Sequence, residues 1–130
     1  MGSDEQKDLW RLSASEVLPL LRNGDLKVEH YVQSLVRRIQ GRDSAVKAWV
    51  YFSPHSALKQ AQQLDDIPVS QRGPLFGLPI AIKDVALTKD MPTQYNSPLL
   101  ESQNAIKTDA NVIMTLRAAG TLPRSFSIYS

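Results

Sequence analysis

Residues 73–84 read GPLFGLPIAIKD, and this stretch decides the fold class of the chain. The glycines and proline of residues 73–77 predict a turn, and the apolar run over 78–82 predicts a short, buried central strand. Lys83 follows that strand directly. Because ligand sites in open α/β sheets gather at the carboxyl ends of strands, Lys83 stands where a side chain can take part in chemistry. A lysine that loses its hydration in such a place can act as a general base.

Several short sequence segments, called blocks here, continue from this stretch along the chain. They are Asp84-Val85, Met91-Pro92-Thr93, Asn96-Ser97-Pro98-Leu99-Leu100-Glu101, Thr108-Asp109-Ala110 and Leu116-Arg117-Ala118-Ala119-Gly120. With these blocks, residues 72–120 resemble the amidase signature family of serine hydrolases, and the rest of the chain resembles it more weakly. The resemblance implies that Lys83 is the lysine of a Ser–cis-Ser–Lys triad. The two serines are expected in a Gly/Ser-rich segment several tens of residues further on, which this chain does not reach.

The resemblance also implies an α/β fold class. We expect an incomplete amidase-signature fold, with N-terminal helices and the first strands of a mixed sheet. Residues 1–130 would form one incomplete domain, with a disordered start over 1–8 and an atypical tail over 121–130. The implied reaction is hydrolysis of the C–N bond of a small-molecule carboxylic amide through an acyl-serine intermediate, without cofactor or metal. Since Lys83 lacks its serine partners, we expect the chain to be truncated and inactive alone.

Composition excludes several other classes of protein. The chain has 130 residues, of which 42% are hydrophobic and 22% charged, as in a globular domain with a real core. Its net charge is only +2, which argues against nucleic-acid binding despite a pI near 9.0. The absence of cysteine excludes a disulfide framework and a thiol nucleophile. A polar start and the lack of a long apolar run predict a cytoplasmic protein with no membrane contact.

Capping signals predict two helices before the sheet. Ser13 and Glu16 have the spacing of a capping box, so a helix is expected to start there and to stop at Gly24. An apolar stripe predicts a second helix over residues 27–40, which Gly41 would close. Both helices match the N-terminal layer that the resemblance implies.

The rest of the chain carries weaker local signals. Residues 46–52 alternate between two faces and predict a strand, and Ser53-Pro54 predicts the start of the next helix. Thr108-Asp109 is expected to cap a last helix that ends at Gly120.

The loop over residues 88–107 is long, and the resemblance implies that it borders the active-site cleft. Serines in this loop and in the tail do not lie in a Gly-rich elbow, so they are not expected to replace the missing nucleophile: Ser97, Ser102, Ser125, Ser127 and Ser130. Pro123 is unfavourable in a central strand. The tail is therefore predicted to be poorly ordered and to add little to the core.

Two other classes of function remain open. The chain could be a non-catalytic interaction module that associates with itself, or with a full-length relative, through an open edge of its sheet. A nucleic-acid binder is suggested by the pI alone, and weak phosphate affinity at low salt would test it. The two histidines, His30 and His55, have no carboxylate at ligand spacing, so no metal site is expected.

Overall fold

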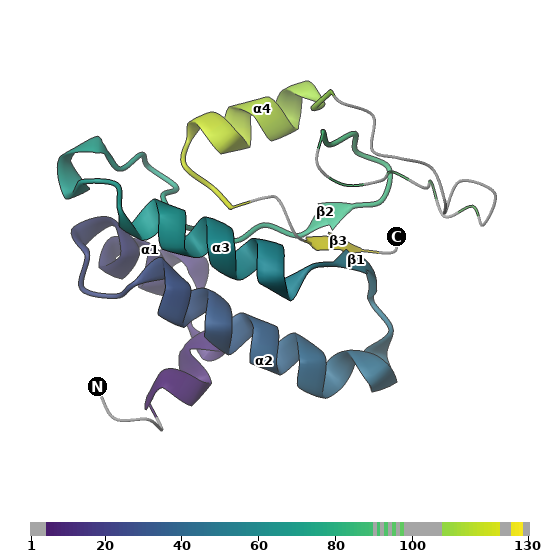
Figure 1. Cartoon of the computed structure of the whole chain (residues 1–130), viewed down its shortest axis with the longest axis horizontal. Helices are drawn as coiled ribbons and strands as arrows, with labels where there is room; N and C mark the ends of the chain where they lie inside the picture. The colour runs from purple at the N-terminus through teal and green to yellow at the C-terminus, as the bar shows by residue number, and fades with distance from the viewer. Residues whose placement is uncertain are drawn as a thin grey trace.

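The computed structural model describes residues 5–89, 91, 93, 95, 97, 108–122 and 126–128, which Figure 1 shows in colour. In chain order its elements are η1 (Glu5–Arg11), α1 (Ala14–Asn23), α2 (Val28–Val46), β1 (Trp49–Phe52), α3 (Pro54–Asp65), η2 (Val69–Gln71), β2 (Ile82–Lys83), α4 (Asn111–Ala118) and β3 (Phe126–Ile128). Helices α1 to α3 lie on one side of a small sheet, and α4 lies on the other side of β2 (Figure 1). This arrangement is the α/β class that the sequence predicts.

Element η1 is a 3-10 helix over residues that the sequence assigned partly to a disordered start. Leu9 is buried in the core at 8% exposure, and the Trp10 N–H donates to Ser34 Oγ on α2 at 3.0 Å. A buried apolar side chain and a backbone bond to a distant helix hold this short element against α2.

Helix α1 starts and stops where the sequence predicts. Ser13 Oγ accepts from the Glu16 N–H at 3.3 Å, and the Ser13 N–H donates to Glu16 Oε2 at 2.7 Å, which completes the capping box. At the other end Gly24 takes a left-handed φ of 82°, a conformation in which glycine has no steric cost.

Helix α2 is longer than predicted, and the strand after it is shorter. The helix continues through Gly41, which lies at an exposed position with open space around its Cα. It ends at the left-handed residue Lys47, whose N–H donates to Asp43 O at 2.7 Å. A glycine in a helix costs about 1 kcal/mol, and continued hydrogen bonding offsets that cost here. Residue 46 is therefore helical, and β1 takes only the last part of the predicted strand.

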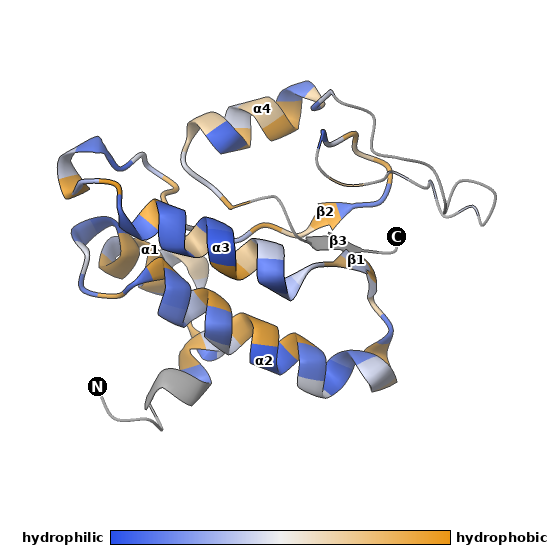
Figure 2. Ribbon diagram, viewed as in Figure 1, coloured by the Kyte–Doolittle hydropathy of each residue, from blue (hydrophilic) through white to orange (hydrophobic). Residues whose placement is uncertain are grey.

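Helices α2 and α3 lie side by side and share the main core (Figure 1). The Asp65 carboxylate at the end of α3 accepts from the Val28 and Glu29 N–H groups at 2.8 and 3.0 Å, which satisfies donors in the first turn of α2. Figure 2 shows the apolar and polar stripes of these helices. The buried residues of this core are Leu9, Val17, Leu21, Leu26, Val28, Tyr31, Val32, Val36, Ala57, Ala61, Phe76 and Leu122.

The sheet is mixed, as predicted, but its central strand is β3. The strand order is β1-β3-β2, and β3 runs antiparallel to β1 and parallel to β2. The segment 78–82, predicted as the central strand, is regular only from Ile82, and β2 lies at one side of the sheet. Pro79 explains the late start, since proline has no N–H to donate to a ladder. It makes an isolated parallel bridge with Leu122 instead.

The prediction that the tail adds little to the core is wrong for its first two residues. Thr121 and Leu122 are exposed by only 4% and 0%, and β3 holds the middle of the sheet. Pro123 does not prevent this, because the regular strand starts at Phe126, beyond it. The tail supplies the strand that joins β1 to β2.

Candidate active site

The turn before Lys83 depends on two glycines. A Cβ on Gly73 would lie 2.7 Å from Ala119 O, and a Cβ on Gly77 would lie 2.7 Å from Val28 Cγ2. Gly77 also has a φ of +75°, which other residues rarely adopt. Both positions therefore require the smallest residue, and the predicted turn is present.

The turn lies alongside the residues that follow α4. Three backbone hydrogen bonds of 2.9 Å join the two segments: Leu75 N–H to Ala119 O, Gly77 N–H to Gly120 O, and Leu122 N–H to Leu78 O. The same parallel course continues into the sheet, where Lys83 is paired with Ile128. Lys83 is thus held at the carboxyl end of a strand, the position predicted from the sequence.

The Lys83 side chain is exposed. Its neighbour Ile82 is 5% exposed and belongs to a second, smaller core with Met91 and Ile113. Because side chains alternate along a strand, burial of Ile82 turns Lys83 outward. The loss of hydration expected for Lys83 is therefore not found. Among the residues that the structure describes, its ammonium group has no ion-pair partner.

Asp84 lies on the other side of the chain from Lys83 and is only 3% exposed. The chain turns at this point, because the Val85 and Ala86 N–H groups donate to Lys83 O at 2.7 and 3.0 Å. The Tyr95 N–H donates to Asp84 O at 3.0 Å, which brings part of the following loop back to the end of β2. The described residues after Lys83 thus turn at the end of β2 and return to it at Tyr95.

Two threonines hold the described part of the following loop. Thr88 Oγ1 donates to Met91 O at 3.2 Å, and Thr93 Oγ1 donates to Ala86 O at 3.3 Å. Most of residues 88–107 lies outside the described residues, so the expectation that this loop borders a cleft stays a prediction.

Asp109 does not cap α4 as predicted. The N-cap residue is Ala110, and it makes no side-chain capping bond. Asp109 Oδ2 lies 2.8 Å from Arg117 Nε, and its Oδ1 accepts from the Lys89 N–H at 2.8 Å. Burial works against its ionisation, but the Lys89 N–H and the hydrogen bond and charge of Arg117 lower the pKa of Asp109 overall. This carboxylate ties α4 to the loop that follows β2.

Within the described residues, the structure shows no hydrogen bond between the Lys83 side chain and the serines that were considered as substitute nucleophiles. Ser97 is half-buried and Ser127 pairs with Ile82 in the sheet, while Ser102, Ser125 and Ser130 lie outside the described residues. His30 and His55 lie on α2 and α3. In the described part of the chain no three His, Cys, Asp or Glu side chains are grouped to hold a metal, and no helix is long and apolar enough to cross a membrane.

Comparison with known proteins identifies the family. The amidase family profile matches residues 30–124, which extends the predicted best match in both directions. A glutamyl-tRNA(Gln) amidotransferase subunit from Lysinibacillus sphaericus is 35% identical over 114 residues, which are 88% of this chain and 23% of the relative.

Solved structures show the same fold. An amidase family protein from Bacillus anthracis superposes with a TM-score of 0.81 at 23% identity, over 96% of this chain and 25% of that one. The native peptide amidase from Stenotrophomonas maltophilia superposes with a TM-score of 0.80 at 24% identity, over 94% of this chain and 25% of the amidase. The chain spans about a quarter of the length of these proteins. It belongs to the amidase signature family.

Proposed function

We propose that this chain carries the lysine-bearing part of an amide-hydrolysing site, with Lys83 as the general base. The observation that supports this most is the placement of Lys83 within the matched residues 30–124, at the end of a strand paired in parallel and before a tight turn. The proposed substrate is a small-molecule carboxylic amide.

In the proposed reaction the neutral Lys83 amine takes a proton from a bridging serine, which takes the proton of a nucleophilic serine. That serine attacks the amide carbonyl carbon, the C–N bond breaks, and the amine leaves with a proton. Water then hydrolyses the acyl-serine and releases the carboxylic acid. Lys83 is exposed here, so the reaction needs further protein packed over it to bring both serines to its side chain.

We propose that residues 1–130 alone do not catalyse this reaction. Lys83 is exposed, and no hydrogen bond among the described residues joins its side chain to a serine. None of the candidate serines lies in a Gly-rich elbow that would supply a nucleophile and an oxyanion hole, so the main catalytic contributions are not expected from these residues. The test is an assay of the purified chain with a chromogenic anilide and an ester, and the expected rate equals that of buffer. Turnover that disappears in Lys83→Ala but persists in Lys89→Ala would overturn this part of the proposal.

The alternative function is a non-catalytic interaction module. In the described sheet β1 and β2 each pair with β3 alone, so each has an edge without a strand neighbour there. Unpaired strand edges favour association with another chain. Sedimentation velocity over a range of concentrations distinguishes the two proposed functions. A reversible dimer that Val50→Lys in β1 abolishes would favour the interaction module. A monomer at all concentrations would favour the lysine-bearing part of an amide-hydrolysing site.

A further inference from the structure

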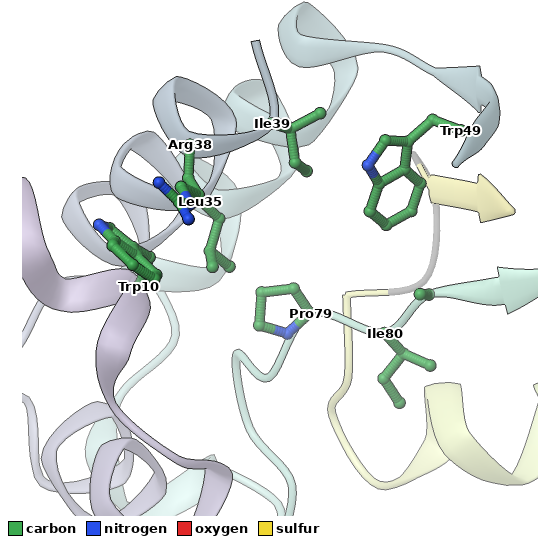
Figure 3. Close-up of a pocket in the computed structure, with 8 residues that line it drawn as sticks. Trp10, Leu35, Arg38, Ile39, Trp49, Pro79 and Ile80 are labelled. Atoms are coloured by element: carbon green, nitrogen blue, oxygen red, sulfur yellow. The ribbon is translucent and has the colours of Figure 1, made fainter. Parts of the chain in front are cut away.

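An apolar cavity of about 250 Å³ lies away from the Lys83 side chain, between η1, α2, β1 and residues 79–81. Figure 3 shows the side chains around it. Its apolar walls are Trp10, Leu35, Ile39, Trp49, Pro79 and Ile80. Dry apolar cavities of about 150 Å³ bind benzene, so this cavity has room for a larger apolar group.

One charged residue, Arg38 of α2, also lines the cavity. Its guanidinium carbon lies 4.1 Å from the centre of the Trp10 ring, so cation–π contact holds the charge at the cavity wall. Among the side chains that the structure describes, which in η1 begin at Asp8, Arg38 has no carboxylate partner. A guanidinium fixed by stacking keeps its N–H donors available for a carboxylate.

The charge around the cavity is positive. Arg42 lies one helical turn beyond Arg38 and lines an adjoining hollow with Ile39 and Trp49. Asp43 is the acidic residue that lines this hollow, and its Oδ1 already accepts a hydrogen bond from the Ala48 N–H at 2.8 Å. The site therefore combines an apolar floor with a cationic rim.

The geometry points to a binding site for an amphiphilic carboxylate, with its apolar body between Trp10 and Trp49 and its carboxylate on Arg38. A neutral or cationic amphiphile would fill the same space without the ionic contact. This inference is independent of the role proposed for Lys83, because no step of it uses that side chain.

The chain offers a direct reporter for this site. Trp10 and Trp49 are its two tryptophans, and both line the cavity. Octanoate and 1-octanol are transparent where tryptophan absorbs and have the same length, so they serve as probes. We expect octanoate to change the tryptophan emission saturably, and to bind about tenfold or more tightly than octanol.

Three variants decide between the outcomes. Arg38→Gln keeps much of the stem that covers Trp10 but removes the charge, so octanoate should lose about tenfold in affinity while octanol is unchanged. Ala81→Leu narrows the cavity at an exposed residue and should weaken both probes. Arg22→Gln, on α1 away from the cavity, is the matched control and should alter neither.

Each contrary result overturns the inference. Equal affinity for octanoate and octanol would mean an apolar hollow without carboxylate recognition. Non-saturating emission changes would mean adsorption only. Octanoate binding that survives both Arg38→Gln and Ala81→Leu, in variants whose circular dichroism matches the parent chain, would place the ligand elsewhere.

Discussion

Asp109 and Arg117 are joined at two points: Oδ2 lies 2.8 Å from Nε, and Nη2 donates to Oδ1 at 3.3 Å. Their side chains are only 6% and 18% exposed. The pair connects two of the sequence blocks that identify the family, one before α4 and one at its end. Because Asp109 also accepts from the Lys89 N–H, it couples α4 to the loop beyond Lys83.

Replacing Arg117 with alanine should destabilise the chain. The change leaves the Asp109 carboxylate buried without its cation, and such hydrogen bonds to charged groups are worth about 1.5–3 kcal/mol. We expect the free energy of unfolding in urea to fall by that amount. Arg22→Ala on the exposed side of α1 is the control. If both variants had the same midpoint, the ion pair would contribute nothing.

The same pair predicts a pH dependence. The pKa of Asp109 is below its ordinary 3.8 in the folded chain, so its stabilising contribution is complete above that value and is lost as the pH falls through the lower folded pKa. The thermal midpoint of the parent chain should thus fall more steeply below about pH 4 than that of Asp109→Asn. Parallel curves for the two proteins would show that this carboxylate is not responsible.

Two glycines should respond oppositely to alanine. Gly77→Ala places a Cβ 2.7 Å from Val28 Cγ2 at a φ of +75°, so we expect a loss of about 2 kcal/mol or more. Gly41→Ala meets open space within α2 and should add about 0.5–1 kcal/mol. Chemical denaturation of both variants measures the difference. A Gly77→Ala chain as stable as the parent chain would contradict the described turn.

The residues after Gly120 should matter for stability. Leu122 is fully buried, and its removal as Leu122→Ala should cost about 2–5 kcal/mol. Val112→Ala on α4, where the side chain is 59% exposed, should change stability by less than about 0.5 kcal/mol. A melt of Leu122→Ala that matches the parent would restore the view that the tail lies apart from the core.

The sequence predicted those features that local chemistry decides. The capping box of Ser13 and Glu16, the stop at Gly24 and the turn through Gly77 each depend on residues a few positions apart. The start of α3 is also as predicted, since Ser53 Oγ accepts from the Ser56 N–H at 3.3 Å. Such interactions need no knowledge of the rest of the fold.

The features that were missed depend on tertiary context. Gly41 reads as a helix stop, but the helix passes through it because its hydrogen bonds continue. The central role of β3 depends on partners far away in the chain, at β1 and β2. Asp109 has the spacing of a helix cap but binds Arg117 instead. This contact depends on how α4 packs against the loop after β2, which the local sequence does not show. Lys83 is exposed because Ile82, its neighbour in the strand, is buried. The sequence alone does not show which face of this strand is buried.

The central claim is that Lys83 is the base of an amide-hydrolysing site. Its most direct measurement uses a chimera in which residues 30–122 of this chain replace the matching segment of the Stenotrophomonas maltophilia peptide amidase. With folding verified by circular dichroism, the chimera should hydrolyse a peptide amide. Lys83→Ala should lower kcat by about 10²–10⁴-fold, while Lys89→Ala changes it little. A folded chimera that is inactive, or one whose activity survives Lys83→Ala, would contradict the claim.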